Sequence, residues 1–243
     1  MALREEHEKI GNWLFRWRSY LPLLVLGLAL IGMRDFTYIR NDHYWDLAWE
    51  AFCLIVSFLG LSIRALVVGY VPEGTSGRNT RAQKAALLNM TGLYSIVRHP
   101  LYLGNFFIWL GISLFVRHWM LSLICVLIFW VYYERIMFAE EEFLRKQFGG
   151  AYEDWADNTP CFLPRMSQWK PPSMPFAWKK VLKDEYSGFF AIIAVFTSLE
   201  VIGDWIAAGR LILDWEWGIL FIAGLLIYLT LLIMKKRKML ESR

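Results

Sequence analysis

Residues 92–104 read Gly-Leu-Tyr-Ser-Ile-Val-Arg-His-Pro-Leu-Tyr-Leu-Gly, and residues 140–152 read Glu-Glu-Glu-Phe-Leu-Arg-Lys-Gln-Phe-Gly-Gly-Ala-Tyr. Between these polar stretches lie two apolar runs that are separated only by Arg117-His118. A connection this short makes consecutive helices antiparallel neighbours. We therefore expect a helical hairpin that brings the two polar stretches together, with the rest of the chain as its scaffold.

The composition indicates a membrane protein. The 243 residues are 57% hydrophobic with 13 tryptophans, and the mean hydropathy is +0.36. Apolar runs of bilayer length recur, and a bilayer core admits only helices or closed barrels as spanning structures. The predicted fold class is therefore all-α, a polytopic membrane bundle of about six transmembrane helices.

The chain divides into four predicted parts. An interfacial segment (1–19) precedes a membrane core (20–164), and a surface linker (165–185) precedes two additional spans with a basic tail (186–243). The six predicted spans are 20–33, 47–71, 101–116, 119–138, 187–203 and 217–234. Lys and Arg cluster in the alternate connections, so the positive-inside rule puts both termini and both polar stretches on the cytoplasmic side.

Two features near the second span each have two interpretations. Arg64 lies within the span, where a cation is expensive; it is either functional or snorkels to the nearby interface. The basic, glycine-containing connection 72–86 is either a lid over a site or a solvated loop near anionic head groups.

Arg98-His99-Pro100 stands at the mouth of the third span. Arg98 offers a planar fork for a carboxylate or phosphate, and His99 exchanges protons near neutral pH. The helix that begins at Pro100 adds free N–H groups and a positive dipole end. This segment is therefore either an anion site or an anchor in which Arg98 binds lipid phosphate.

The acidic triplet at the end of the fourth span favours a site. Three adjacent carboxylates at a membrane surface repel one another, and at helical spacing one or two of them face the hairpin partner. We assign Glu140 and Glu141 to that face and leave Glu142 out. The alternative is a solvated face balanced by i,i+4 pairs of Glu141 with Arg145 and of Glu142 with Lys146.

Other kinds of site fit the sequence poorly. Only four histidines are present, none at ligand spacing from another, so no metal site is predicted. The chain lacks a P-loop, a Rossmann glycine pattern and a G-x-S-x-G motif. No nucleic-acid partner is expected, and any cofactor must be bound by something other than a soluble nucleotide fold.

Taken together, the two stretches resemble a known family. Gly92-x-Tyr94-x-x-x-Arg98-His99-Pro100-x-Tyr102-x-Gly104, then Glu140-Glu141-x-x-Leu144-x-x-x-Phe148-Gly149-x-x-Tyr152 and a closing Leu163-Pro164, are similar to the isoprenylcysteine carboxyl methyltransferase and phospholipid methyltransferase superfamily. The resemblance covers about residues 47–164 and implies an integral membrane enzyme that uses S-adenosylmethionine in a cytoplasm-facing cofactor pocket.

The resemblance also implies the site residues. The expected cofactor-binding residues are Tyr94, Arg98, His99, Pro100, Tyr102, Gly104, Glu140 and Glu141. The expected catalytic residues are Arg98, His99, Arg135 and Glu140. Arg135 is similar to an arginine of the prenylcysteine members, displaced by about one residue.

The substrate class follows from the charges and the setting. An anionic oxygen acceptor (carboxylate or phosphate) needs a cation and no general base, and the abundance of cations favours it over an amine. An acceptor with a hydrophobic chain can enter from the bilayer, so the expected partner is a lipid or lipid-linked substrate. The two extra C-terminal spans depart from the prenylcysteine members, so a prenylcysteine substrate is not carried over.

Three alternatives stay open. Sterol-type membrane reductases carry a similar Arg-His-Pro-x-Tyr-x-Gly segment and bind NADPH there. A phospholipid amine N-methyltransferase would use His99 or a glutamate as the base. A helical membrane adaptor would use its polar stretches only as anchors.

Overall fold

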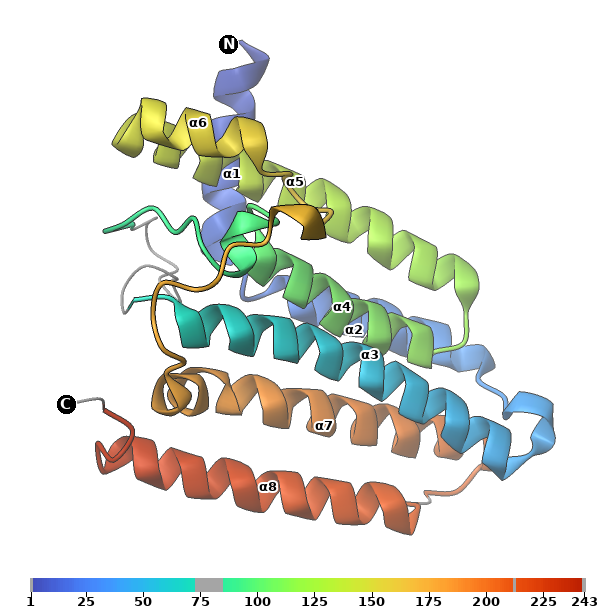
Figure 1. Ribbon diagram of the computed structural model, residues 1–243. Coiled ribbons are helices and arrows are strands. Elements are labelled where there is room, and N and C mark those ends of the chain that lie inside the picture. Colours follow the sequence, from blue (N-terminus) through green and yellow to red (C-terminus); the bar gives the residue numbers. More distant parts are fainter. Residues whose placement is uncertain (1, 73–84, 212, 242–243) are drawn as a thin grey trace.

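The computed structural model describes residues 2–72, 85–211 and 213–241, and these residues form an all-helical bundle without a β-strand (Figure 1). This confirms the predicted fold class. Connection 72–86, interpreted as either a lid or a solvated loop, lies largely outside the described residues. The helices are α1 (Leu3–Trp17), α2 (Leu21–Gly32), α3 (His43–Tyr70), α4 (Pro100–Phe115), α5 (Trp119–Phe148), α6 (Gly150–Asn158), α7 (Trp178–Ala208) and α8 (Trp215–Lys236).

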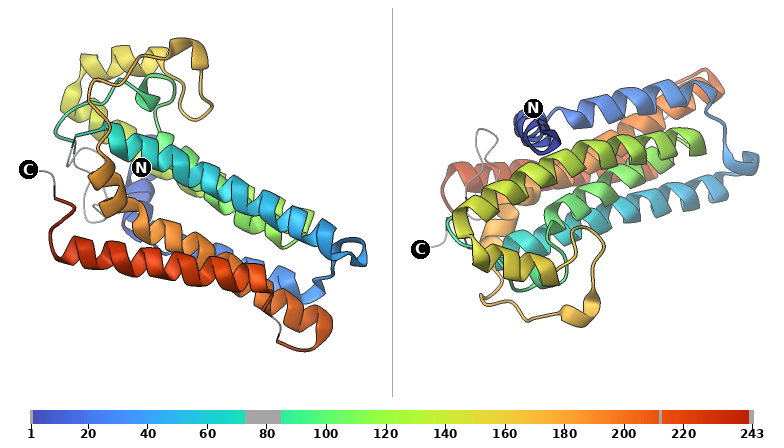
Figure 2. Two further views of the ribbon diagram at one scale, coloured as in Figure 1. Left: turned by 60° about the horizontal axis from the view of Figure 1, so that its bottom comes forward. Right: turned by 90° about the horizontal axis from the view of Figure 1, so that it is seen from above.

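The long helices lie side by side along one direction, while α1 and α6 gather at one end (Figures 1 and 2). Helix α3 packs against α4 and α7, α7 against α8, and α5 against both α4 and α1. One buried apolar cluster joins α2, α3, α4, α7 and α8, and a second joins α1, α4 and α5. The second cluster lies next to the two polar stretches.

Four helices, α3, α5, α7 and α8, are long and apolar enough to cross a membrane. Helix α4 is apolar but has 16 residues, and α2 has 12. At 1.5 Å per residue, α2 is only about 18 Å long, as expected for a first span that thins the bilayer locally. The predicted count of six is compatible with this bundle.

Three predicted boundaries differ from the structure. The fourth span and the amphipathic segment after it form one continuous helix, α5, because residues 139–147 are mostly good helix formers. It ends at Gly149, whose φ of 54° favours glycine. Between this end and the predicted linker lies α6, anchored by the fully buried Tyr152, and α7 begins at Trp178 inside the predicted linker.

The tight turn between α4 and α5 is confirmed. Arg117 adopts a positive φ of 62°, and the ring of His118 caps α5 by accepting a hydrogen bond from the Leu121 amide at 3.3 Å. The Arg117 guanidinium reaches Asp46 and Glu50 of α3, at 2.9 Å each. These ion pairs fix the turn against the neighbouring helix.

Glycines set the close approach of α3 to α4. A Cβ added to Gly104 would lie 2.6 Å from Cγ of Arg64 and 2.7 Å from the carbonyl oxygen of Gly60. Small residues at such a seam let two membrane helices pack backbone against backbone.

Beside this seam, the side chain of Arg64 points into the bundle rather than toward the membrane–water interface. Its guanidinium binds both carboxylate oxygens of Glu185 on α7, at 3.0 and 2.8 Å, and donates to the side chain of Asn105 on α4 at 2.7 Å. Arg64 therefore connects α3, α4 and α7. Its side chain does not snorkel to the interface, so the second of the two interpretations is wrong.

Replacing Gly104 by Ala should destabilise the bundle, because the added methyl must displace Arg64 or separate α3 from α4. We expect a loss of about 1–3 kcal/mol in the free energy of unfolding, the usual cost of overpacking. Thermal unfolding in detergent micelles measures it. Gly27→Ala is the matched control, since its Cβ would meet nothing within 4 Å; equal melting of the two variants would contradict the tight seam.

Candidate functional site

The two polar stretches meet at one end of the bundle, where α4 begins and α5 ends (Figure 1). Nε2 of His99 lies 2.9 Å from Oε1 of Glu141, and Nη1 of Arg98 lies 3.2 Å from its Oε2. Nδ1 of His99 lies 3.6 Å from Oε2 of Glu140. The predicted contact between the stretches is confirmed, and both carboxylates face the histidine.

The backbone before α4 is held by the segment that follows α6. The amide of Arg98 donates to the carbonyl of Pro160 at 2.8 Å, and the amide of Arg165 donates to the carbonyl of Ile96 at 2.9 Å. Farther back, the amide of Gly92 donates to the carbonyl of Lys170 at 3.0 Å. Residues 159–170 therefore act as a clamp that positions Arg98 and His99, a role that the sequence did not reveal.

The surroundings of His99 favour its positively charged form. Its side chain is buried, which disfavours the charged form, but hydrogen bonds with Cys161, Glu140 and Glu141 outweigh burial and hold the pKa of His99 well above its ordinary value. Both ring nitrogens face carboxylates, an arrangement that suits the doubly protonated ring. The site therefore contains a buried imidazolium between two acids.

Aromatic rings extend the site into the bundle. The ring of His99 stacks on Tyr102, with centroids 5.7 Å apart and planes 20° apart, and Tyr102 contacts Tyr133 of α5 at 4.9 Å. The Tyr133 hydroxyl accepts from Asn105 at 3.2 Å, and Asn105 in turn accepts from Arg64. Arg64 thus reaches the site only through Asn105 and the two tyrosines.

Two polar atoms at the site are buried without a hydrogen-bond partner among the residues that the structure describes. They are Nε of Arg98 and the hydroxyl of Tyr152. Both groups lie beside Glu141. The charge of Arg98 and the hydroxyl of Tyr152 therefore act on the Glu141 carboxylate. A buried donor left unpaired costs about 1–3 kcal/mol, so these atoms are natural contacts for a polar ligand.

Other predicted site residues occupy the margin. Tyr94 lies in a short turn (Leu93–Ser95), where burial and the negative charge of Glu140 raise its pKa, and its carbonyl accepts from the indole of Trp155 at 3.1 Å. Pro100 is buried at the first position of α4. Gly104 faces α3 at the seam described above rather than the polar cluster.

Arg135 lies away from the cluster. Its Nη1 is 3.5 Å from Nε2 of His7 on α1. A different cation, Arg18, acts electrostatically on both Glu140 and Tyr102. The sequence placed Arg18 only in an interfacial segment, because nothing in a linear pattern shows where the chain between α1 and α2 passes.

Glu142 was left out of the predicted site, and the structure turns it to the other side of α5. Its buried carboxylate binds Arg4 of α1 at 2.6 Å and also pairs with Arg145. Lys146 pairs with Glu8. The i,i+4 pairs considered for a solvated face are therefore wrong; two of the charges bind α1 instead.

His99, Glu141 and Cys161 also lie close enough to share a metal ion, with their ligand atoms within 4.8 Å of one another. Histidine spacing in the sequence does not reveal such a mixed set, since three separate elements contribute to it. A metal there would require His99 to lose its proton, against the two carboxylates that hold it.

Comparison with known proteins shows which family the chain resembles. The family model described as phospholipid methyltransferase matches residues 75–151. The nickel-cobalt-cadmium resistance protein NccN of Alcaligenes xylosoxydans xylosoxydans is 30% identical over 68% of this chain and 72% of its own length. The cobalt-zinc-cadmium resistance protein CzcN of Cupriavidus metallidurans is 28% identical over 68% and 71%.

A third relative matches a shorter region. The protein-S-isoprenylcysteine O-methyltransferase of Schizosaccharomyces pombe is 34% identical over 35% of this chain and 36% of its own length. No solved structure matches. The chain therefore belongs to the isoprenylcysteine carboxyl methyltransferase and phospholipid methyltransferase superfamily of membrane methyltransferases.

Proposed function

We propose that this protein transfers a methyl group from S-adenosylmethionine to an anionic oxygen, a carboxylate or phosphate, of a lipid or lipid-linked acceptor. The observation that supports it is the contact of Glu141 with both Arg98 and His99, with Glu140 on the other ring nitrogen of His99. These contacts place cationic and acidic side chains together where α4 begins and α5 ends. We propose that this end of the bundle is cytoplasmic.

The groups at this site fit the cofactor. S-adenosylmethionine carries a carboxylate, an ammonium, a ribose diol and a sulfonium. Arg98, with its unpaired Nε, and the positive dipole end at the start of α4 suit the carboxylate. Glu140, whose side chain is 32% exposed, suits the ammonium or the ribose hydroxyls. Tyr94 and Tyr102 add aromatic surface at the edge.

In the proposed mechanism the protein positions and stabilises rather than exchanging protons. When bound, S-adenosylmethionine supplies an electrophilic methyl group. Glu140 and Glu141 stabilise positive charge near the methyl donor, and the clamp by residues 159–170 keeps Arg98 and His99 in place. Stacking on Tyr102 fixes the ring plane of His99.

The protonation of His99 favours an anionic acceptor over an amine. An amine must lose a proton to become a nucleophile, and the charged form of His99 that Glu140 and Glu141 favour cannot accept it, which leaves only a glutamate as the base. A carboxylate or phosphate is already nucleophilic and needs only a cation. Arg98 and Arg18 are the cations that act on the acidic pair, whereas Arg64 and Arg135 are engaged elsewhere.

The membrane setting is part of the proposal. An acceptor with an acyl or prenyl chain reaches the end of α4 and α5 sideways from the lipid. The names of two relatives associate those proteins with metal resistance, so for this chain we propose that growth under metal stress is a suitable condition for detecting the methylated lipid.

Binding of S-adenosylhomocysteine tests the cofactor. We expect it to stabilise the purified protein where NADPH does not. Glu141→Gln should weaken binding roughly 10- to 100-fold, because it removes a carboxylate that orders both Arg98 and His99. Isothermal titration measures the affinity. The control is Glu134→Gln, an exposed glutamate of α5; preferential binding of NADPH would instead favour the reductase alternative.

The pH dependence of stability tests the charge state of His99. Because its pKa is raised in the folded protein, the stabilisation is full below its ordinary value of 6.5 and is lost as the pH rises through the raised pKa. The melting temperature should therefore fall on the alkaline side of 6.5 in the wild type, and less steeply in His99→Gln. His7→Gln serves as the control, and parallel curves for all three proteins would contradict an imidazolium.

Labelling of total lipid tests the acceptor. Membranes that contain the active protein, incubated with methyl-labelled S-adenosylmethionine, should yield a labelled lipid that membranes with Glu141→Gln lack. A methyl carboxylate ester releases its label as methanol in mild alkali, whereas a methyl phosphodiester or an N-methyl group keeps it, and mass spectrometry of the stable product tells these two apart. Label on an amine nitrogen would point to the amine N-methyltransferase instead.

A further inference from the structure

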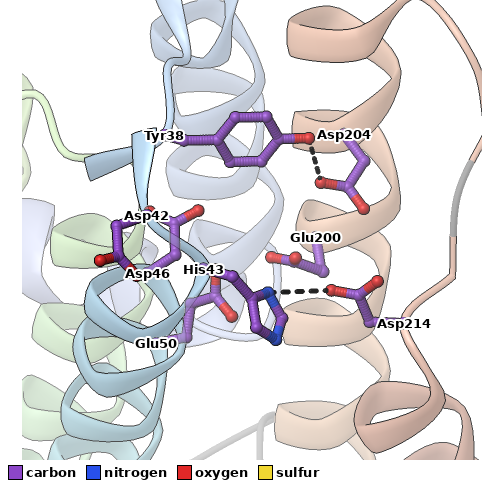
Figure 3. Close-up of a pocket in the computed structure, with 8 residues that line it drawn as sticks. All are labelled: Tyr38, Asp42, His43, Asp46, Glu50, Glu200, Asp204 and Asp214. Atoms are coloured by element: carbon purple, nitrogen blue, oxygen red, sulfur yellow. Dashed lines mark hydrogen bonds and ion pairs between the residues drawn. The ribbon is translucent and has the colours of Figure 1, made fainter. Parts of the chain in front are cut away.

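The end of the bundle opposite the proposed cofactor site contains a second polar cluster. The start of α3, the end of α7 and the residue before α8 enclose a cavity of about 290 Å³ (Figure 3). Its lining residues are Tyr38, Asp42, His43, Asp46, Glu50, Glu200, Asp204 and Asp214. Six of these eight are acidic, and the lining includes no Lys or Arg.

Part of this acidity is already balanced. Arg117 of the α4–α5 turn binds Asp46 and Glu50, and the indole of Trp217 donates to Glu50 at 3.1 Å. Asp42 caps α3 by accepting from the amide of Tyr44 at 2.8 Å. These three carboxylates therefore have structural partners.

The remaining three carboxylates face one another. Glu200 and Asp204 lie four residues apart on one face of α7, and Asp214 approaches them from the loop before α8. One oxygen of each lies within 4.8 Å of the others. Asp204 accepts a hydrogen bond from Tyr38 at 2.9 Å, which orients it without cancelling its charge.

Glu200 is the group that points to a ligand. It is 4% exposed, and its Oε2 has no hydrogen-bond partner among the described residues. Figure 3 shows its carboxylate projecting from α7 into the cavity, toward Glu50 and His43. A buried acid that faces other acids and is short of a donor is stabilised by a cation, which competes there with a proton.

We propose that Glu200, Asp204 and Asp214 bind a divalent transition-metal ion in this cavity. Carboxylate oxygens bind such ions at about 2.0–2.2 Å, so ligands on opposite sides of an ion are roughly 4.2–4.4 Å apart. The observed spacing of up to 4.8 Å needs only a small inward movement of the side chains.

His43 selects the class of metal. Its Nδ1 lies 3.9 Å from the carboxylate of Asp214, and with Asp214 and Glu216 it forms a second set of ligand atoms within 4.8 Å of one another. Imidazole nitrogen is a ligand of zinc, cobalt and nickel, whereas magnesium and calcium prefer oxygen alone. Asp214 belongs to both sets, so it links the histidine to the buried acids.

The test uses the full-length protein in detergent after treatment with a chelator. Co²⁺ is titrated by its visible absorption and Zn²⁺ by calorimetry, with Mg²⁺ and Ca²⁺ as comparisons. We expect saturable binding of one equivalent of Co²⁺ or Zn²⁺ near neutral pH. Absence of saturable binding, or tighter binding of Ca²⁺ than of Zn²⁺, would overturn the proposal.

Variants locate the site. Glu200→Gln should weaken Zn²⁺ binding at least about tenfold, as loss of a ligand or of its support does. It should not lower the melting temperature of the metal-free protein, because it removes one of several crowded negative charges. Should Glu200→Gln fail to fold, Asp214→Asn, from the loop before α8, gives the same test.

Two controls separate this site from its surroundings. Asp35→Asn changes an exposed acid outside the cavity lining and should leave the affinity for Zn²⁺ unchanged. Glu141→Gln should also leave it unchanged, because the set of His99, Glu141 and Cys161 lies at the other end of the bundle. Loss of Zn²⁺ binding in Glu141→Gln with retention in Glu200→Gln would assign the metal to that set and overturn the proposal.

Discussion

A buried imidazolium between two carboxylates is the interaction on which the site depends. His99 stands just before α4, and Glu140 and Glu141 lie on the last turns of α5, so their contact exists only if the hairpin closes at the correct angle. Each charged group would be costly to bury alone. Their mutual neutralisation makes it possible to hold three ionised groups where the bundle meets the membrane surface.

The same rule governs the other charges in the bundle. Arg64 on α3 binds Glu185 on α7, and Arg117 binds Asp46 and Glu50 on α3. Each pair joins helices that are distant in sequence. In lipid, where apolar burial distinguishes poorly between alternative helix contacts, such pairs and the glycine seam at Gly104 select one packing of the helices.

Local patterns were enough to predict the hairpin and most of the spans. The lengths of two apolar runs and the short turn at Arg117-His118 implied that Arg98 and His99 meet Glu140 and Glu141, and they do. Helix α6 and the early start of α7 were missed, because their first turns are polar and resemble a surface linker. Tertiary packing, not hydropathy, stabilises them.

Contacts between distant segments were beyond the reach of any pattern. Arg64 and Glu185 are 121 residues apart, and the clamp on Arg98 comes from residues 159–170. The lining of the acidic cavity likewise comes from three separate segments of the chain. A search by spacing finds sites carried by one or two neighbouring elements, so it found the hairpin site and overlooked the cavity.

The interface between α3 and α7 carries charged side chains near both ends of the bundle. Near one end α3 and α7 meet in an ion pair, Arg64 with Glu185, in which the charges cancel. At the other end Glu50 of α3 pairs with Arg117, but Glu200 of α7 keeps one carboxylate oxygen without a hydrogen-bond partner among the described residues. The α3–α7 contact is balanced in charge at Arg64 and Glu185 but has too little positive charge at Glu200. A cation bound at Glu200 would therefore stabilise the contact between the two helices. The cation that we propose at the far end would thus act on the same α3–α7 interface that positions Arg64 near the proposed cofactor site.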